Sequence, residues 1–138
     1  MTERLMSEMV RNQRPLTLDP DATVAEACRQ MFDRRVGAVL VTDSEGQLLG
    51  VFTGRDAVRM LAQGKASDCP VLDVMTRDPC TMAPGGSAIE ALRLMEDGGF
   101  RHVPVVDRGR VLGIVSWGDF RTNEHDRLDT EVAYWERI

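Results

Sequence analysis

Two stretches of the chain space their apolar residues as helices do. In each stretch apolar positions recur every three or four residues, which indicates one buried stripe on an amphipathic helix. They are Val24, Ala27, Cys28 and Met31 in the first stretch, and Ile89, Leu92 and Met95 in the second. A hydroxyl residue opens each stretch and a glutamate follows three positions later, as Thr23 and Glu26 and as Ser87 and Glu90. This spacing predicts a capping box at the start of both helices.

After each predicted helix, two short runs rich in Val, Ile and Leu are separated by a polar turn, as in β-hairpins. The runs are Gly37–Thr42 and Leu48–Phe52, then His102–Val106 and Val111–Val115. Extended segments are expected before the helices, at Leu16–Leu18 and Cys80–Met82, and further helices after the hairpins, from Thr53–Asp56 and Ser116–Asp119. The pattern therefore predicts an α/β (α+β) chain in which β-α-β-β-α occurs twice.

The two copies are an internal repeat. Thr17 to Asp43 aligns without gaps on Thr81 to Asp107, at an offset of 64. The identical pairs are Thr17/Thr81, Pro20/Pro84, Glu26/Glu90, Ala27/Ala91, Arg29/Arg93, Met31/Met95, Asp33/Asp97, Val39/Val103, Val41/Val105 and Asp43/Asp107. We expect the first repeat at residues 5–64, the second at 71–122 and a C-terminal tail helix at 123–138. An internal repeat of this kind indicates the fold more strongly than any single motif does.

Composition narrows the function. The 138 residues carry a net charge of −5, which lacks the basic footprint of a nucleic-acid binder. No signal peptide and no apolar stretch of about 18 residues is found, so neither export nor a membrane helix is expected. Cys28, Cys69 and Cys80 are odd in number and show no CxxC spacing, which argues against disulfides and zinc. A cytoplasmic protein with free thiols is the simplest interpretation.

One constellation occurs in both repeats, as Thr53 followed by Asp56 and as Ser116 followed by Asp119. A helix N-terminus presents free amides and a partial positive charge, which suit a phosphate. An ionised aspartate three residues on can accept from two adjacent hydroxyls, such as those of ribose. The same spacing also makes a helix cap that needs no ligand. Residue chemistry alone leaves both interpretations open.

The repeated set of motifs resembles the CBS domain, named after cystathionine β-synthase. The phrases that carry the resemblance are Val71–Thr76 (VLDVMT), Arg101–Asp107 (RHVPVVD) and Gly113–Asp119 (GIVSWGD), and it covers about Leu5 to Arg121. It implies a pseudo-twofold pair of repeats with clefts between them that bind AMP, ADP, ATP or S-adenosylmethionine. It also implies a homodimer that regulates an unknown effector protein. No cofactor and no metal is expected.

The resemblance also implies residue roles. Thr53 and Ser116 would hold phosphate, and Asp56 and Asp119 would hold ribose. The base would lie against one segment in each repeat, Val36-Gly37-Ala38 and Phe100-Arg101-His102, flanked by Thr17 and Thr81. Small residues such as Gly37 let a ring approach the backbone. Pro104 removes one amide donor, so we expect the strand that carries it to lie at a sheet edge.

The two predicted sites are not equivalent. Arg101 offers a fork of donors that matches phosphate, where the first repeat has Gly37. His102 adds a donor whose charge is sensitive to pH, although a half-buried histidine bonded to backbone is as good an interpretation. Arg55 reaches toward a phosphate or is an exposed helix arginine. Trp117 stacks on a base or, as we prefer, forms part of a dimer surface.

The sequence also bears on two other classes of function. An enzyme is not expected, because the two histidines, His102 and His125, belong to no catalytic triad and no metal-ligand spacing occurs. The alternative is a ligand-free dimerisation or protein-interaction module, with Trp117, Met60, Phe120 and the tail as its surface. In the tail Leu128–Ile138, the spacing of Leu128, Val132 and Trp135 predicts an amphipathic helix, which we expect to dock on its own module.

Overall fold

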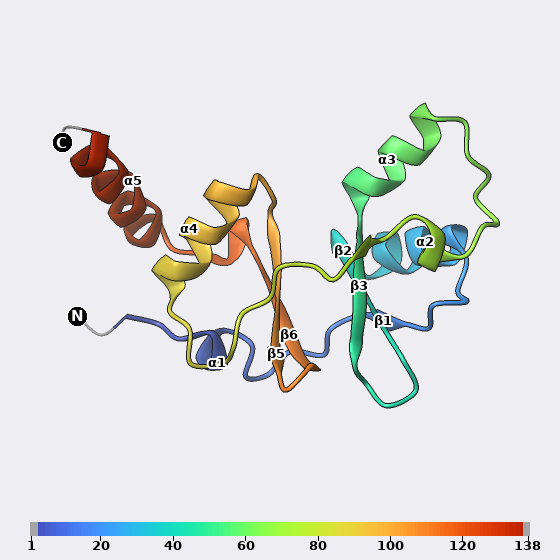
Figure 1. The fold of residues 1–138 in the computed structure, drawn as a ribbon, viewed down its shortest axis with the longest axis horizontal. Helices are drawn as coiled ribbons and strands as arrows, with labels where there is room; N and C mark the ends of the chain where they lie inside the picture. Colours follow the sequence, from blue (N-terminus) through green and yellow to red (C-terminus); the bar gives the residue numbers. More distant parts are fainter. Residues whose placement is uncertain (1–2, 137–138) are drawn as a thin grey trace. The chain divides into compact units, whose positions relative to one another are not determined.

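The computed structural model describes residues 3–136, with side chains described as far as residue 130. The chain divides into two compact units (Figure 1). The first-repeat unit consists of Arg14–Pro79 and Arg108–Val111. The second-repeat unit consists of Met1–Gln13, Cys80–Asp107 and Leu112–Ile138. Both units mix helices with strands, so the predicted fold class is confirmed.

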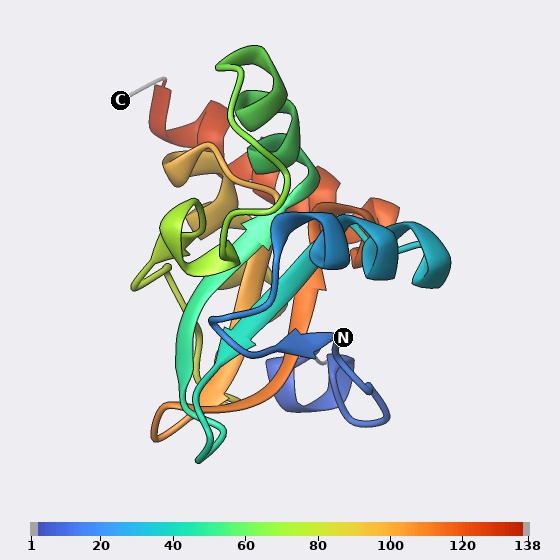
Figure 2. The same cartoon turned by 90° about the vertical axis from the view of Figure 1, so that its right-hand side faces the viewer.

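A four-stranded sheet organises the first-repeat unit. Its strands are β1 (Thr17–Leu18), β2 (Ala38–Thr42), β3 (Leu48–Thr53) and β4 (Thr76–Arg77), in that spatial order. β1 is parallel to β2, whereas β2 and β3 form the predicted antiparallel hairpin and run side by side in Figure 2. β4 pairs antiparallel with β3. Sequence analysis did not predict β4, because a two-residue exposed strand has no periodicity to detect.

Two helices lie on the same side of this sheet, α2 (Val24–Arg34) and α3 (Gly54–Ala62) (Figure 1). Thr23 caps α2, since its hydroxyl accepts the amide of Glu26 at 3.1 Å, and this bond is one half of the predicted capping box. The stripe of α2 and Met60 of α3 pack on the inward side chains of the hairpin, with a 3-10 turn (Val71–Asp73) closing the core. The core residues are Leu16, Val24, Ala27, Met31, Val39, Val41, Phe52, Met60, Val71, Val74 and Met75.

The second-repeat unit is built on a two-stranded sheet of β5 (His102–Asp107) and β6 (Arg110–Ser116). Its helices are α1 (Met6–Met9), α4 (Ala88–Gly98) and α5 (Thr122–Glu136). Ser87 and Glu90 form the predicted capping box of α4. The core consists of Met6, Val10, Ala88, Ile89, Ala91, Leu92, Met95, Val103, Val105, Val115, Phe120 and Leu128. The N-terminal segment is therefore part of this unit and not of the first-repeat unit.

Two predictions for the second repeat were wrong in part. The strand expected at Cys80–Met82 is reduced to one parallel bridge between Met82 and Val105. The helix expected from Ser116–Asp119 is a three-residue 3-10 turn, η2 (Trp117–Asp119). It ends because Phe120 adopts an extended conformation (φ −89°, ψ 148°) and inserts its ring into the core. The aligned residue in the first repeat, Ala57, is too small to anchor the chain in this way, and α3 continues through it.

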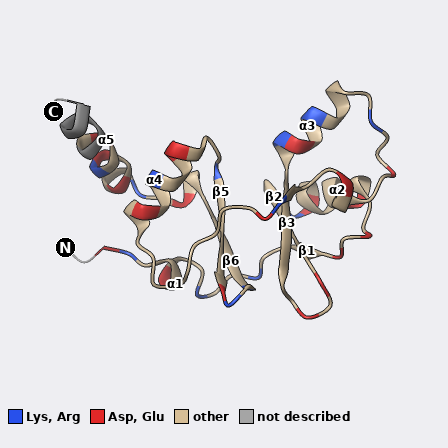
Figure 3. Cartoon of the chain, in the orientation of Figure 1, with Lys and Arg blue, Asp and Glu red and all other residues tan. Residues whose placement is uncertain are grey.

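The tail is helical, as predicted, and α5 begins at Thr122, one residue before the expected boundary. Leu128 is buried in the core of its own unit, which confirms the expected docking of the tail on its own module. The side chains of Val132 and Trp135 lie outside the described residues. None of the helices in the described residues is long and apolar enough to cross a membrane. Lys and Arg positions are interspersed with Asp and Glu positions in both units (Figure 3).

Candidate ligand-binding sites

The first candidate site lies where β3 ends and α3 begins. Thr53 is the N-cap of α3, and its hydroxyl accepts the amide of Asp56 at 3.3 Å. The Oδ2 atom of Asp56 accepts in return from the Thr53 amide at 2.9 Å and from the Thr53 hydroxyl at 3.1 Å. Its Oδ1 atom pairs with Arg59 at 3.0 Å, and Asp56 is only 5% exposed. The capping interpretation is therefore realised here, without excluding a ligand.

The register of the hairpin brings the predicted base-binding segment to the same place. Ala38 on β2 pairs directly with Thr53 on β3, and the amide of Gly54 donates to the carbonyl of Gly37 at 3.1 Å. Thr17 lies on β1, opposite Leu40 and two residues along from Ala38. Val36 and Gly37 are exposed beside this junction, as is Arg55 in the first turn of α3. The site residues predicted in the first repeat thus belong to neighbouring strands of one sheet, the segment that precedes β2 and the first turn of α3: Thr17, Val36, Gly37, Ala38, Thr53, Arg55 and Asp56.

The second candidate site repeats this geometry with other side chains. The amide of Trp117 donates to the carbonyl of Arg101 at 2.9 Å, which is the counterpart of the bond from Gly54 to Gly37. The amide of Ser116 donates to Oδ2 of Asp119 at 2.7 Å. Asp119 is exposed, unlike Asp56. The same backbone frame therefore carries a buried aspartate in one repeat and an accessible one in the other.

An aromatic and cationic cluster surrounds the second site. The Arg101 guanidinium carbon lies 4.9 Å from the centroid of the Trp117 ring, within the range of a cation–π contact. On α5, His125 lies 4.7 Å from Trp117 between ring centroids. Trp117 is half-buried and packs against the core of its unit. Two glycines, Gly37 and Gly54, occupy the positions of Arg101 and Trp117 in the first repeat.

His102 is half-buried on β5, next to Arg101. Burial lowers the pKa of His102, and the charge of Asp119 opposes that shift. The imidazole is therefore mainly neutral at pH 7, where it can donate one hydrogen bond and accept another.

The other two predicted site residues, Thr81 and Pro104, differ in exposure. Thr81 is exposed, one residue before the bridge in which the Met82 amide donates to the carbonyl of Pro104 at 3.0 Å. The Pro104 side chain is fully buried, so the ring itself faces the core. Any contribution of Pro104 to a ligand would come from its backbone.

Sequence analysis missed three residues beside the second site: Arg4, Glu124 and His125. Arg4 donates to Glu124 through Nε at 3.0 Å and Nη2 at 2.6 Å, and its Nη2 also donates to the carbonyl of Asp119 at 3.3 Å. The hydrogen bonds with Arg4 lower the pKa of Glu124, and Glu124 raises the pKa of Arg4, so both stay charged at neutral pH. No local signal could have paired residues so far apart in the chain.

The surface expected for an interaction module needs correction. Met60 and Phe120 are buried in the cores of their units, so neither forms an exposed contact surface. Met60 faces the core from α3, and Phe120 faces the core from the residue that follows η2. Within the described part of the chain, no three His, Cys, Asp or Glu side chains gather in a way that could hold a metal ion.

Comparison with known proteins identifies the repeat. A model of the CBS domain matches residues 5–63 and 71–126. The chain is 37% identical to the CBS domain-containing protein YhcV of Bacillus subtilis over 109 residues, which are 78% of this chain and 77% of that protein. It spans about a fifth of the length of the CBS domain-containing relatives that it matches in Arabidopsis thaliana.

Solved structures agree. A CBS domain protein from Pyrobaculum aerophilum, complexed with AMP, superposes with a TM-score of 0.83 at 26% identity, covering 92% of this chain and 99% of that one. The CBS domain pair of protein MJ0100, in complex with 5′-methylthioadenosine and S-adenosylmethionine, gives a TM-score of 0.78 at 26% identity, covering 84% of this chain and 95% of that one. From its two matched repeats and these relatives, the chain belongs to the CBS domain family.

Proposed function

We propose that this chain is a regulatory module that binds an adenine nucleotide or related adenosyl ligand at the strand-to-helix junction of each repeat. The observation that carries the proposal is the pair of equivalent backbone bonds, Gly54 to Gly37 and Trp117 to Arg101. Each bond holds the segment expected to face the base beside the residues expected to face phosphate and ribose. The complexes of family members with AMP, 5′-methylthioadenosine and S-adenosylmethionine support the adenosyl part of the ligand.

The proposed roles follow from donor and acceptor chemistry. Thr53 and Ser116 offer a hydroxyl and nearby amides to a phosphate or other anionic group. Asp56 and Asp119 accept from the ribose hydroxyls. The base lies against the backbone of residues 36–38 or 100–102, with Thr17 or Thr81 at its side. Arg55 and Arg101 are the cations available to a phosphate in the two repeats.

The two sites have different requirements for binding. A ribose that binds Asp56 has to compete with Arg59 and with two bonds from Thr53. Asp119 is exposed, and the hydrogen bond described for its carboxylate comes from the Ser116 amide. We expect the second-repeat site to bind more tightly, because an exposed carboxylate gives up fewer protein contacts on binding.

Binding regulates a partner in this proposal, since the module itself performs no chemistry. A ligand shifts a conformational equilibrium only by its difference in affinity for the two states. A homodimer in the cytoplasm, acting on an effector protein, is the assembly we propose.

A thermal-shift panel tests the proposal. Nucleotide-free protein is heated with AMP, ADP, ATP, S-adenosylmethionine and, as the non-adenine control, GTP. A ligand at about 100 times its Kd stabilises the fold by about 2.7 kcal/mol, which raises the Tm clearly. We expect a selective rise with an adenine ligand that disappears in the Asp56→Ala, Asp119→Ala double variant. An equal rise in that variant would contradict the ribose assignment.

A second candidate function is a protein-interaction module. It is favoured by large apolar side chains that the helices of the first-repeat unit leave exposed, Phe32 on α2 and Val58 and Leu61 on α3. Val58 and Leu61 are three residues apart and so share a helix face. Light scattering of the wild type and of a Val58→Glu, Leu61→Glu variant distinguishes the two. Loss of self-association only in the variant, with no thermal shift by any nucleotide, would favour this candidate.

A further inference from the structure

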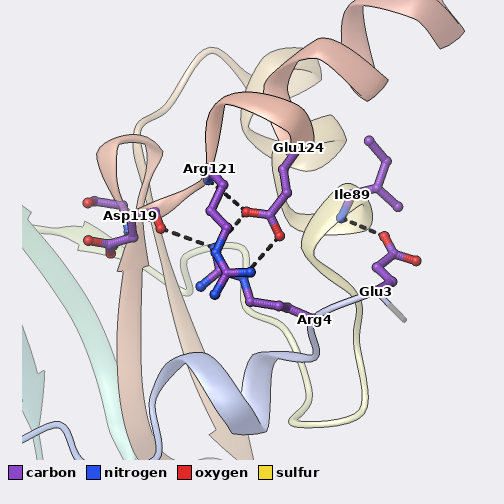
Figure 4. Close-up of polar contacts among 7 residues, drawn as sticks. Glu3, Arg4, Ile89, Asp119, Arg121 and Glu124 are labelled. Atoms are coloured by element: carbon purple, nitrogen blue, oxygen red, sulfur yellow. Dashed lines mark hydrogen bonds and ion pairs between the residues drawn. The ribbon is translucent and has the colours of Figure 1, made fainter. Parts of the chain in front are cut away.

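The N-terminal segment ties α5 to the turn of the second candidate site. The Arg4 guanidinium binds both carboxylate oxygens of Glu124, in the first turn of α5, and the carbonyl of Asp119 (Figure 4). The Oε1 atom of Glu124 also accepts the amide of Arg121 at 2.7 Å. Arg4 and Glu124 are both largely buried, with side chains 22% and 13% exposed. One guanidinium thus contacts the site turn and the start of α5 together.

The same turn contacts α5 on its other side. Trp117 contacts His125 with ring planes inclined by 48°. Phe120, which joins η2 to α5, lies edge-on to His125 at 6.2 Å between centroids. Arg101 covers Trp117 and belongs to the segment expected to face the base. Arg4 on one side of η2, and the rings of Trp117 and Phe120 on the other, therefore connect the second candidate site to α5.

The turn is short, and the capping box of Ser116 and Asp119 is its local support. η2 is three residues long, and 3-10 turns of this length have poorer hydrogen-bond geometry than α-helices. Exposed segments with few buried contacts open at low free energy. The Ser116 amide holds the Asp119 carboxylate locally at 2.7 Å, whereas Arg4 holds the Asp119 backbone carbonyl and so connects the turn to Glu124 and α5. In the first repeat Asp56 lies inside α3 and needs no such support.

We propose that docking of α5 prepares the second-repeat site for its adenosyl ligand, so that ligand binding and α5 docking stabilise each other. This inference rests on the proposed function and names the regulation of that site. Arg4, Glu124 and His125 act as positioning residues that hold the turn in its binding conformation. By thermodynamic reciprocity, the ligand strengthens α5 docking by the same factor by which α5 docking strengthens ligand binding. Departure of the ligand loosens α5, which is then the element a partner senses.

Calorimetric titration with AMP tests the first half of the coupling. In Arg4→Gln and Glu124→Gln the Kd for AMP should rise about fivefold to tenfold, the lower range of typical allosteric coupling. Gln13→Ala is the matched control. It removes two hydrogen bonds, both 2.8 Å long, from the same N-terminal segment to Ile114 of β6 without touching α5 or the turn. Gln13→Ala should lower the Tm and leave the Kd for AMP unchanged. If Arg4 had only a structural role, Arg4→Gln would likewise lower the Tm without raising the Kd.

A variant cycle assigns the effect to one repeat. The weakening by Arg4→Gln should persist in an Asp56→Asn background and vanish in an Asp119→Asn background. Hydrogen exchange tests the second half. Saturating AMP should slow exchange of the α5 amides in the wild type, and Arg4→Gln should speed it without AMP while amides of α4 stay protected, which shows that the variant remains folded.

The outcomes separate the two claims. AMP binding that leaves α5 exchange unchanged, or an Arg4→Gln variant that binds AMP as the wild type does, overturns the coupling and leaves the proposed function intact. Failure of the wild type to bind AMP, ATP or S-adenosylmethionine overturns the proposed function and the coupling with it. Weaker binding in Arg4→Gln and Glu124→Gln, together with slower α5 exchange on AMP binding, supports the coupling.

Discussion

The two repeats place one sequence motif in two different environments. In the first repeat, Asp56 is buried in a complete capping box and paired with Arg59. In the second, Asp119 is exposed on a short 3-10 turn that long-range contacts hold in place. A hydroxyl followed by an aspartate three residues later therefore forms a capping box in both repeats, with a buried carboxylate in the first and an accessible one in the second. Duplication preserved the backbone frame while the side chains around it diverged.

The divergence extends to the neighbouring positions. Gly37 and Gly54 leave the first junction open, whereas Arg101 and Trp117 cover the second with a cation and a ring. Phe120 then turns the chain into the core, where α3 of the first repeat simply continues. The first junction is thus held by local contacts, whereas the second also relies on contacts with distant residues. The following variants test that contrast.

The largest effect on stability is expected at Phe120, the buried residue that ends η2 in the second repeat. Phe120→Ala removes a buried ring, 7% exposed, and should lower the free energy of unfolding by about 3–4 kcal/mol, as core Phe→Ala substitutions do. Phe32→Ala is the matched control, because Phe32 is 83% exposed. This substitution should change the free energy of unfolding by less than about 0.5 kcal/mol. Urea unfolding of both variants provides the measurement. Equal losses would mean that Phe120 does not anchor the turn.

The next effect compares the two aspartates. Asp56→Ala breaks the capping box and leaves Arg59 without its buried partner, so it should cost about 1–2 kcal/mol of stability. Asp119→Ala removes an exposed acceptor and should cost less than about 0.5 kcal/mol. Thermal unfolding without ligand checks the ranking. A reversed order would contradict the division of roles between the repeats.

A third variant makes the second site resemble the first. Arg101→Gly removes the guanidinium that covers Trp117 and so removes a candidate donor to phosphate. ATP affinity should fall about tenfold, or about 1.4 kcal/mol, the scale of one charge-assisted hydrogen bond. Arg55→Gly is the corresponding change near the first site. Calorimetry that gives the wild-type Kd for Arg101→Gly would remove Arg101 from the phosphate role.

The smallest effect concerns pH. Burial lowers the pKa of His102 below its ordinary value of 6.5, with Asp119 acting in the opposite direction. As the pH falls through 6.5, the unfolded chain takes up a proton that folded His102 does not, so stability decreases until the folded-state pKa is passed. The Tm of the wild type should therefore fall relative to that of His102→Gln between pH 7.5 and 5.5. Parallel Tm profiles for the two proteins would show that His102 contributes nothing.

Local patterns predicted much of the fold. The hairpins and the caps of α2 and α4 follow from residues close together in sequence, and all of them were predicted. Phe120 could not be predicted as a helix breaker, because nothing in its local sequence separates a buried extended Phe from a helical one. The bond between Arg4 and Glu124 joins the two ends of the chain, beyond the reach of any periodicity.

The candidate sites were predicted less completely than the fold. The spacing of Thr53 and Asp56 identified a junction, but not which aspartate the fold buries. That difference depends on Arg59 and on whether a helix continues, and both are set by packing. Trp117 contacts Arg101 and His125 within its own unit, and its expected place at a dimer surface stays a prediction.

Calorimetric titration of AMP into nucleotide-free protein tests the central claim most directly. The wild type should give a saturable binding isotherm, Asp119→Asn should weaken it more than Asp56→Asn does, and the double variant should give no binding heat while remaining folded. A wild-type isotherm preserved in the double variant, or no binding of AMP, ATP or S-adenosylmethionine by the wild type, would contradict the account.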